Sequence, residues 1–150
     1  KKEFCIELKK NMLSLPFPAP AFFSGINIFS AGKFKMSPIH VTNVAEIIVR
    51  SINNNHAFKK VYELGGKSYN WNEIIKIITS ACNKEKLIVP TPAFFIKLIA
   101  TFFDKYEWFP ISRDQITMLL ESNVCNSKKI FKRYNITPID FTSSELNYLH

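Results

Sequence analysis

The sequence predicts an α/β fold, because it contains one strand–helix–strand unit and two well-marked helix starts. The unit runs over residues 38–66. It has a short apolar strand at 39–41, a helix from about Val44, and a second strand at 61–64 that ends on two glycines. A connection of this kind usually joins parallel neighbours in a sheet. We therefore expect the two strands to be parallel and adjacent.

Both helix starts carry a capping pattern, in which asparagine is followed three residues later by glutamate. Asn43 precedes Glu46, and Asn70 precedes Glu73. Each pair can satisfy the free N–H groups of a first helical turn reciprocally. Apolar residues follow at helical spacing and predict one buried face per helix. They are Val44, Ile47 and Ile48 in the first helix, and Ile74, Ile77 and Ile78 in the second.

The rest of the chain predicts mainly helices. Three prolines at 16–20 force an extended path after the first helix. Short strands are expected at 26–29 and 86–89, the second one stopped by prolines. Helices are expected at 4–12, at 93–103, from Ser112 onward, around Ile130, and from a capping pattern at Thr142 to Leu149.

The net charge of +8 raises the question of an anionic partner. The basic residues are seventeen lysines and three arginines, in a chain that is also rich in Ile and Asn. This bias is typical of an AT-rich coding sequence and weighs against selection for nucleic-acid contacts, for which the arginine fork is favoured. Nucleic acid is therefore not an expected partner.

Cysteine usage and the start of the chain indicate a cytoplasmic setting. Cys5, Cys82 and Cys125 are odd in number and widely spaced, so we expect neither a disulfide framework nor a metal site. The chain opens without an initiator methionine and without an apolar signal segment. A start of this kind, inside a predicted helix, favours a piece of a longer protein.

The most apolar stretch, at 93–103, is too short to span a bilayer, which needs about 20 residues. It either lies in a membrane interface or packs into the protein or against a partner. Packing is favoured, since a helix that is apolar most of the way round is usually buried. This membrane or partner face comprises Phe94, Phe95, Phe102, Phe103 and Trp108.

Several segments, in this order, resemble the late part of extended and atypical short-chain dehydrogenase/reductases. They are Pro38-Ile-His-Val-x-x-Val-Ala-Glu46, Tyr62-Glu-Leu-Gly-Gly66, Asn70-Trp-Asn-Glu-Ile-Ile75, Ile88-Val-Pro-Thr-Pro92, Ser112-Arg-Asp-Gln-Ile116, Leu120-Glu-Ser-Asn-Val124 and Tyr134-Asn-Ile-Thr-Pro138. The sequence is most similar to the NADPH-binding accessory-subunit type of respiratory complex I and to bacterial NAD-dependent epimerase/dehydratase-like proteins. Thr42 and Asn43 stand where the family usually has acidic residues.

The resemblance implies the C-terminal part of a Rossmann-like domain with a small, mostly helical lobe. Residues 1–66 would form the end of the Rossmann-like domain, with a connecting helix and a Pro-rich loop, and 67–150 the lobe. The N-terminal nucleotide-binding half would lie outside the chain and be its first partner. NADP or NAD would be the cofactor of the full-length parent, with none expected for this chain alone. A respiratory complex or the inner face of a membrane would be a further partner.

Two sites that dehydrogenases need are missing from the sequence. The glycines, at 25, 32, 65 and 66, form no glycine-rich phosphate-binding turn. No tyrosine is followed four residues later by a lysine that would lower its pKa. We therefore assign no catalytic and no cofactor-binding residue. By resemblance to sugar-nucleotide enzymes, Lys35 and His40 are substrate-side candidates, although a solvated lysine and a partly buried histidine are the simpler interpretations.

These observations predict a non-catalytic piece of a nucleotide-binding or assembly subunit linked to NADH:quinone oxidoreductase or quinone metabolism. Two alternatives stay open. One is the C-terminal part of a sugar-nucleotide epimerase or dehydratase, and the other is an independent basic module that binds a membrane surface or nucleic acid.

Overall fold

The computed structural model describes residues 4–13, 16–52, 54–103, 117–118 and 120–149. Trp108 and the start of the helix expected from Ser112 lie outside these ranges. The elements, in chain order, are α1 (Phe4–Leu8) with a π-helical turn at Lys9–Leu13, β1 (Ala19–Phe23), a 3-10 helix at Ile28–Ser30, β2 (Lys35–Met36), α2 (Val41–Ile52), a 3-10 turn at Asn55–Ala57, β3 (Tyr69–Asn70), α3 (Trp71–Ala81), β4 (Ile88–Pro92), α4 (Ala93–Phe103), α6 (Lys128–Tyr134) and a 3-10 helix at Ser144–Leu149.

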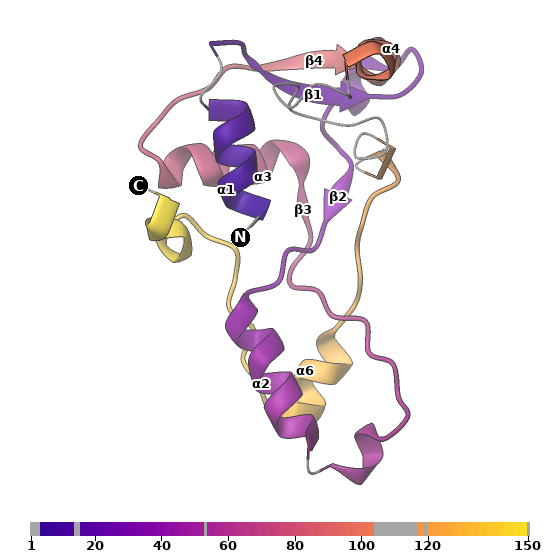
Figure 1. Ribbon diagram of the computed structural model, residues 1–150, viewed down its shortest axis with the longest axis vertical. Coiled ribbons are helices and arrows are strands. Elements are labelled where there is room, and N and C mark those ends of the chain that lie inside the picture. Colours follow the sequence, from indigo (N-terminus) through magenta and orange to yellow (C-terminus); the bar gives the residue numbers. More distant parts are fainter. Residues whose placement is uncertain (1–3, 14–15, 53, 104–116, 119, 150) are drawn as a thin grey trace.

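The molecule is elongated, with its elements gathered in three zones (Figure 1). The β1–β4 pair and α4 lie at one end, α1 and α3 lie in the middle, and α2 and α6 lie together at the other end. The β1–β4 pair is parallel, with Ala19 opposite Ile88 and Phe23 opposite Pro92. Strands β2 and β3 form a short antiparallel pair. The parallel sheet and its helices confirm the predicted α/β class.

The strand predictions were only partly right. The strand expected at 86–89 forms two residues later, as β4, and its partner β1 falls on the proline-rich stretch. Prolines are tolerated there because each strand of a two-stranded sheet is an edge. The strand expected at 26–29 is wrong. Asn27 accepts a hydrogen bond from the N–H of Phe29 at 3.0 Å and caps a 3-10 helix instead, a local contact that competes with strand pairing.

The predicted unit at 38–66 keeps its helix but not its strands. Helix α2 begins at Val41, so Asn43 lies within it and the expected cap at Asn43 is wrong. His40 precedes the helix instead, and its Nδ1 accepts a hydrogen bond from the N–H of Thr42 at 3.3 Å. Residues 39–41 and 61–64 contain no strand. The two segments nevertheless converge, since a Cβ on Gly66 would stand 2.2 Å from the carbonyl oxygen of Pro38.

Helix α3 forms as predicted and is the centre of the main core. Asn70 Oδ1 accepts from the N–H of Glu73 at 2.9 Å, and Glu73 Oε2 accepts from the N–H of Asn70 at 2.7 Å, which confirms this capping box. The indole N–H of Trp71 donates to the carbonyl of Pro20 at 2.8 Å and ties α3 to β1. Buried around α3 are Cys5, Leu13, Ala19, Phe22, Phe34, Leu146 and Leu149.

A second, smaller cluster joins α2 to α6. Ile47 of α2 is buried among Phe131 and Tyr134 of α6 and Ile136 just beyond it. The main cluster, in contrast, takes residues from both sides of position 66. The division of the chain into 1–66 and 67–150 stays a prediction.

Candidate functional site

A cavity of about 610 Å³ lies where the two clusters meet. Its wall is built from the start of α1, residues 36–41, Leu64, Asn123 and Cys125, and the last segment of the chain at 139–148. The volume falls within the range of about 300–1,000 Å³ that is usual for small-molecule sites. The cavity is therefore the candidate site in the part of the chain that the structure describes.

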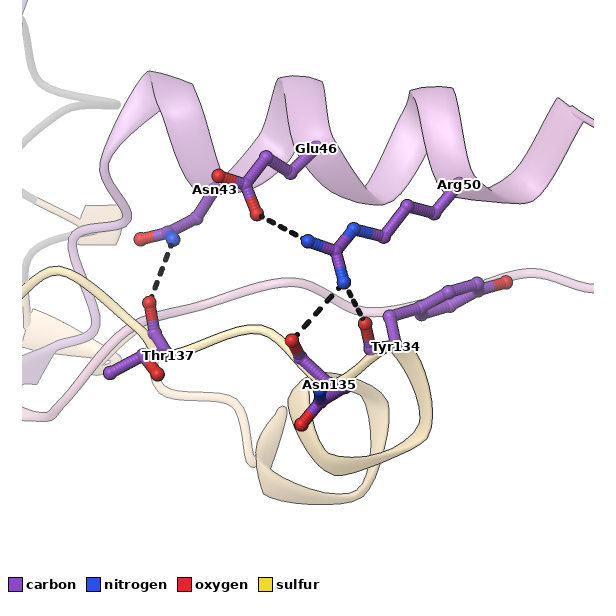
Figure 2. Close-up of polar contacts among 6 residues, drawn as sticks. All are labelled: Asn43, Glu46, Arg50, Tyr134, Asn135 and Thr137. Carbon is purple, nitrogen blue, oxygen red and sulfur yellow. Dashed lines mark hydrogen bonds and ion pairs between the residues drawn. The ribbon is translucent and has the colours of Figure 1, made fainter.

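One wall of the cavity is held in place by polar side chains of α2 (Figure 2). Asn43 donates from Nδ2 to the carbonyl of Thr137 at 3.3 Å and accepts from the N–H of Ile139 at 2.8 Å. Arg50 donates to the carbonyls of Tyr134 and Asn135, the latter at 3.1 Å. These hydrogen bonds hold residues 134–139 against α2. The residues that follow are thereby positioned in the cavity wall.

Arg50 is itself oriented by a carboxylate one helical turn earlier. Its Nη2 lies 3.5 Å from Glu46 Oε2, and both side chains are close to half exposed. An exposed pair at this spacing contributes only about 0.3–0.5 kcal/mol. Its main effect is to keep the guanidinium pointed at the end of α6.

A buried hydroxyl holds together the part of the wall that contains Leu64 and Cys125. Ser127 Oγ accepts from the N–H of Gly65 at 2.7 Å and donates to the carbonyl of Glu63 at 3.0 Å. The chain passes so closely here that a Cβ on Gly65 would stand 2.5 Å from Cys125 Sγ. The paired glycines of the sequence motif thus allow residues 63–66 to fit between residues 37–38 and the start of α6.

Backbone hydrogen bonds also hold Asn123, another residue of the cavity wall, against β2. The N–H of Asn123 donates to the carbonyl of Lys35 at 2.8 Å, and the N–H of Ser37 donates back to the carbonyl of Asn123 at 2.9 Å. This isolated parallel bridge brings residues 123–125 beside 35–37.

The lining is mainly apolar with a few ionisable groups. Among the described residues that line the cavity are His40, Asp140 and Glu145, but no lysine or arginine. Nearby, burial raises the pKa of Tyr69, and the negative charge of Asp140 adds to that rise. The described part of the lining, with two carboxylates and without lysine or arginine, does not suit a phosphate or pyrophosphate group.

Comparisons with known proteins identify two distant relatives of the chain. No family model matches it. The mitochondrial NADH-ubiquinone oxidoreductase 40 kDa subunit of Neurospora crassa is 29% identical over 118 residues, which are 77% of this chain and 32% of that protein. The photosystem II assembly factor Ycf39 of Trieres chinensis is 26% identical over 166 aligned positions, covering 98% of this chain and 51% of that protein. The chain is a distant homologue of these two proteins.

This homology confirms the resemblance that the ordered motifs predict. It also agrees with the fold, since helices and a parallel sheet are what part of a Rossmann-like domain contains. The chain spans about a third of the one relative and about half of the other.

The two substrate-side candidates are not brought together. His40 is half-buried and lines the cavity, whereas Lys35 is exposed on β2 and is not part of the lining. Their roles toward a substrate stay predictions. Asp140 and Glu145 were missed, because no sequence signal places residues of the last segment beside residue 40. Among the described residues no group of His, Cys, Asp and Glu is arranged to hold a metal ion.

The apolar stretch at 93–103 forms α4, and much of it is exposed. Phe94, Phe95 and Phe102 are 71%, 60% and 68% exposed. The side chain of Phe103 and the whole of Trp108 lie outside the described residues. Within the described ranges, no helix has the length and apolar character needed to cross a membrane.

Proposed function

We propose that the chain is the C-terminal, non-catalytic part of an NAD(P)-binding, short-chain-dehydrogenase-like protein. The parent would act as a nucleotide-binding or assembly subunit linked to an NADH:quinone oxidoreductase or to quinone metabolism. The observation that carries the proposal is the match to the complex I 40 kDa subunit along 77% of this chain. The second relative is by its name a photosystem II assembly factor, which supports a role in assembly.

The chemistry of the chain supports a role without turnover. The sequence has no tyrosine–lysine pair at helical spacing and no glycine-rich turn. The cavity wall offers His40 and two carboxylates but no lysine or arginine among its described residues. Because a dinucleotide is gripped through its pyrophosphate by backbone N–H groups and a helix N-terminus, that grip would come from residues beyond this chain.

An uncovered apolar stripe on α2 supports the presence of such a further half. The stripe consists of Val41, Ala45, Ile48, Val49 and Ile52, all exposed and spaced to lie along one side of the helix. Ile47, which packs on α6, lies on a different side. We name Val41, Ala45, Ile48, Val49 and Ile52 the α2 stripe. A helix that pairs with α6 on one side and with a nucleotide-binding sheet on the other would bury both faces.

Nucleotide titration and the gene sequence test the proposal. Isothermal titration with NADPH should give no measurable binding by this chain. The Kd should exceed about 1 mM, which corresponds to a binding free energy of about 4 kcal/mol. The reading frame upstream of Lys1 should encode a Gly-x-x-Gly-x-x-Gly turn, and the extended protein should bind NADP or NAD in the micromolar range.

Two results would contradict the proposal. Micromolar binding of NADPH by the 150-residue chain would reveal a nucleotide site on this chain. An upstream reading frame without the glycine-rich turn would show that the proposed NAD(P)-binding parent protein does not exist. A Tyr-x-x-x-Lys pair in that frame, with turnover of a sugar nucleotide, would favour an epimerase or dehydratase instead.

A further inference from the structure

Exposed apolar side chains gather at one end of the molecule, on two segments that are far apart in the sequence. The loop after β1 exposes Ile26, Ile28 and Phe29, and α4 exposes Phe94, Phe95 and Phe102. We name these six residues the aromatic edge. Phe29 is 87% exposed and Ile26 is 98% exposed, so the described structure covers hardly any of their surface.

The register of the sheet brings the two segments together. Strands β1 and β4 are parallel, and Phe23 is paired with Pro92 at their carboxyl ends. The loop after β1 begins at the next residue, Ser24, and α4 begins at the next residue, Ala93. Both segments therefore leave the sheet from the same edge, and Figure 1 shows the loop curling round beside α4 at the end of the molecule remote from α2 and α6.

The charged side chains within the two stretches that carry the aromatic edge have one sign, and acidic residues begin only at Glu85 and Asp104, on either side of the second stretch. No aspartate or glutamate occurs at residues 8–45 or 86–103, the two stretches that contain these strands, the loop and α4. The same regions contain Lys33 and Lys35 just after the loop, and Lys97 on α4. An apolar surface whose described segments carry lysines and no carboxylates is complementary to an anionic lipid surface. Lysine is, in contrast, depleted from the cores of protein–protein interfaces.

We propose that the aromatic edge docks in the interface of an anionic membrane. The phenylalanine and isoleucine side chains enter the boundary between headgroups and acyl chains, and the lysines lie against the lipid phosphates. Helix α4 lies along the surface, since its 11 residues are about half of what a span requires. This proposal goes beyond the proposed function and holds whether or not the parent binds a nucleotide.

Flotation tests docking on the full 150-residue chain. Vesicles of phosphatidylcholine with phosphatidylserine should carry the chain to the top of a density gradient at low salt, whereas pure phosphatidylcholine should carry at least several-fold less. Raising the salt to about 1 M, where the screening length falls to about 3 Å, should release most of it. Flotation is preferred to sedimentation because self-associated protein stays at the bottom of the gradient.

Paired variants separate the aromatic edge from the rest of the surface. Phe29→Ser with Phe94→Ser should reduce flotation roughly tenfold or more. Phe58→Ser removes an equally exposed ring from the far end, near α2, and should leave flotation unchanged. Likewise, Lys33→Glu with Lys35→Glu should abolish the preference for phosphatidylserine, whereas Lys129→Glu with Lys132→Glu on α6 should have a much smaller effect.

Three results would overturn the proposal. The first is that the chain stays at the bottom with anionic vesicles at low salt, the second is that it floats equally with both kinds of vesicle, and the third is that the control variants lose flotation as much as the edge variants. The double variant could lose flotation because it is misfolded, which its circular dichroism would reveal. In that case the single variant Phe29→Ser is used, since Phe29 lies in a loop outside both cores. It should still weaken flotation several-fold. Nucleotide titration has its own readout, so failure here is distinct from failure of the proposed function.

Discussion

Asn43 Oδ1 lies 2.8 Å from the backbone nitrogen of Ile139, across 96 positions of the sequence. The amide nitrogen of the same side chain donates to the carbonyl of Thr137, so one buried amide serves a donor and an acceptor of the final segment. This segment goes on to form a wall of the cavity. A residue that sequence patterns place at the start of a helix thus acts within it, as the link between α2 and the end of the chain.

Replacing Asn43 should destabilise the protein and loosen the cavity wall. Asn43 is only 2% exposed, so Asn43→Ala leaves two backbone groups without their partner, at a cost of about 1–3 kcal/mol for each group that water cannot reach. Thr42→Ala, at the exposed neighbouring position, should change the free energy of unfolding by less than about 0.5 kcal/mol. Urea unfolding followed by circular dichroism measures both.

An aspartate, which has nearly the same shape as asparagine, should not substitute for Asn43. A carboxylate would still accept from the N–H of Ile139, but it would face the carbonyl oxygen of Thr137 without a proton to donate. Asn43→Asp should therefore be destabilised at neutral pH and regain part of its stability as the carboxyl is protonated. Equal stability of Asn43→Asp and the unmodified chain at pH 7 would show that the bond to Thr137 contributes nothing.

Gly66→Ala should be more destabilising than Gly25→Ala, although only Gly25 has a positive φ. The added Cβ at Gly66 would meet a backbone oxygen, that of Pro38, at 2.2 Å, and such overpacking typically costs about 1–3 kcal/mol. Gly25 has a φ of +72° and nothing within 4 Å of its added Cβ, so only the conformational cost of about 1 kcal/mol applies. The reverse order of melting temperatures would mean that the segments at 38 and 66 separate at little cost.

Predicted elements with local determinants formed more often than those that needed a distant partner, and the cap expected at Asn43 is the exception. The capping box of α3 and the helix at 93–103 follow from residues within one or two turns, and both form as expected. The strands at 39–41 and 61–64 needed a sheet to join, and the described structure offers none there. Asn27 diverted the strand expected at 26–29 by a hydrogen bond to its own turn.

The cavity could not be predicted, because its wall is assembled from contacts across most of the chain. Ser127 meets Gly65 over 62 positions, and Asn43 meets Ile139 over 96. His40 was singled out by its place in a motif and does line the cavity. Asp140 and Glu145 lie in a segment whose sequence pattern indicates only a short helix, so their approach to the same cavity becomes visible only in three dimensions.

The tyrosines should titrate in an order that the structure sets. A hydrogen bond with Tyr134, partly offset by burial and assisted by Arg133, holds the pKa of Tyr62 below its usual value. Burial, and after it the charge of Asp140, raises the pKa of Tyr69. In a titration followed by tyrosinate absorbance, Tyr62→Phe should remove an early step and Tyr69→Phe a late one. Tyr134→Phe should move the Tyr62 step to higher pH.

The raised pKa of Tyr69 should lower the stability of the folded chain at alkaline pH. Because the pKa of Tyr69 is higher in the folded chain than in the unfolded one, its contribution to stability is complete below about pH 10, the ordinary tyrosine pKa. It is then lost as the pH rises through the raised value. Between neutral pH and pH 11, the unmodified chain should therefore lose more stability than Tyr69→Phe. Parallel losses in the two proteins would show that Tyr69 ionises as it does in the unfolded chain.

The α2 stripe should make the isolated chain self-associate. Val49 and Ile52 are 66% and 72% exposed, and burying such side chains between two copies contributes up to about 1.5–3 kcal/mol each. Val49→Lys with Ile52→Lys should therefore weaken self-association roughly a hundredfold or more, as measured by sedimentation velocity over a range of concentrations. Both positions are exposed and helical, where lysine is well tolerated, so the circular dichroism should stay unchanged.

A matched variant assigns the effect to this stripe. Phe17→Lys removes a ring of similar exposure from the proline-rich segment before β1 and should leave self-association as it was. In the extended protein, Val49→Lys with Ile52→Lys should instead lower the melting temperature, because the proposed nucleotide-binding half would bury the same side chains. If the double variant were as stable as the unmodified extended protein, the stripe would face solvent there as well, and that half would have to dock elsewhere on the chain.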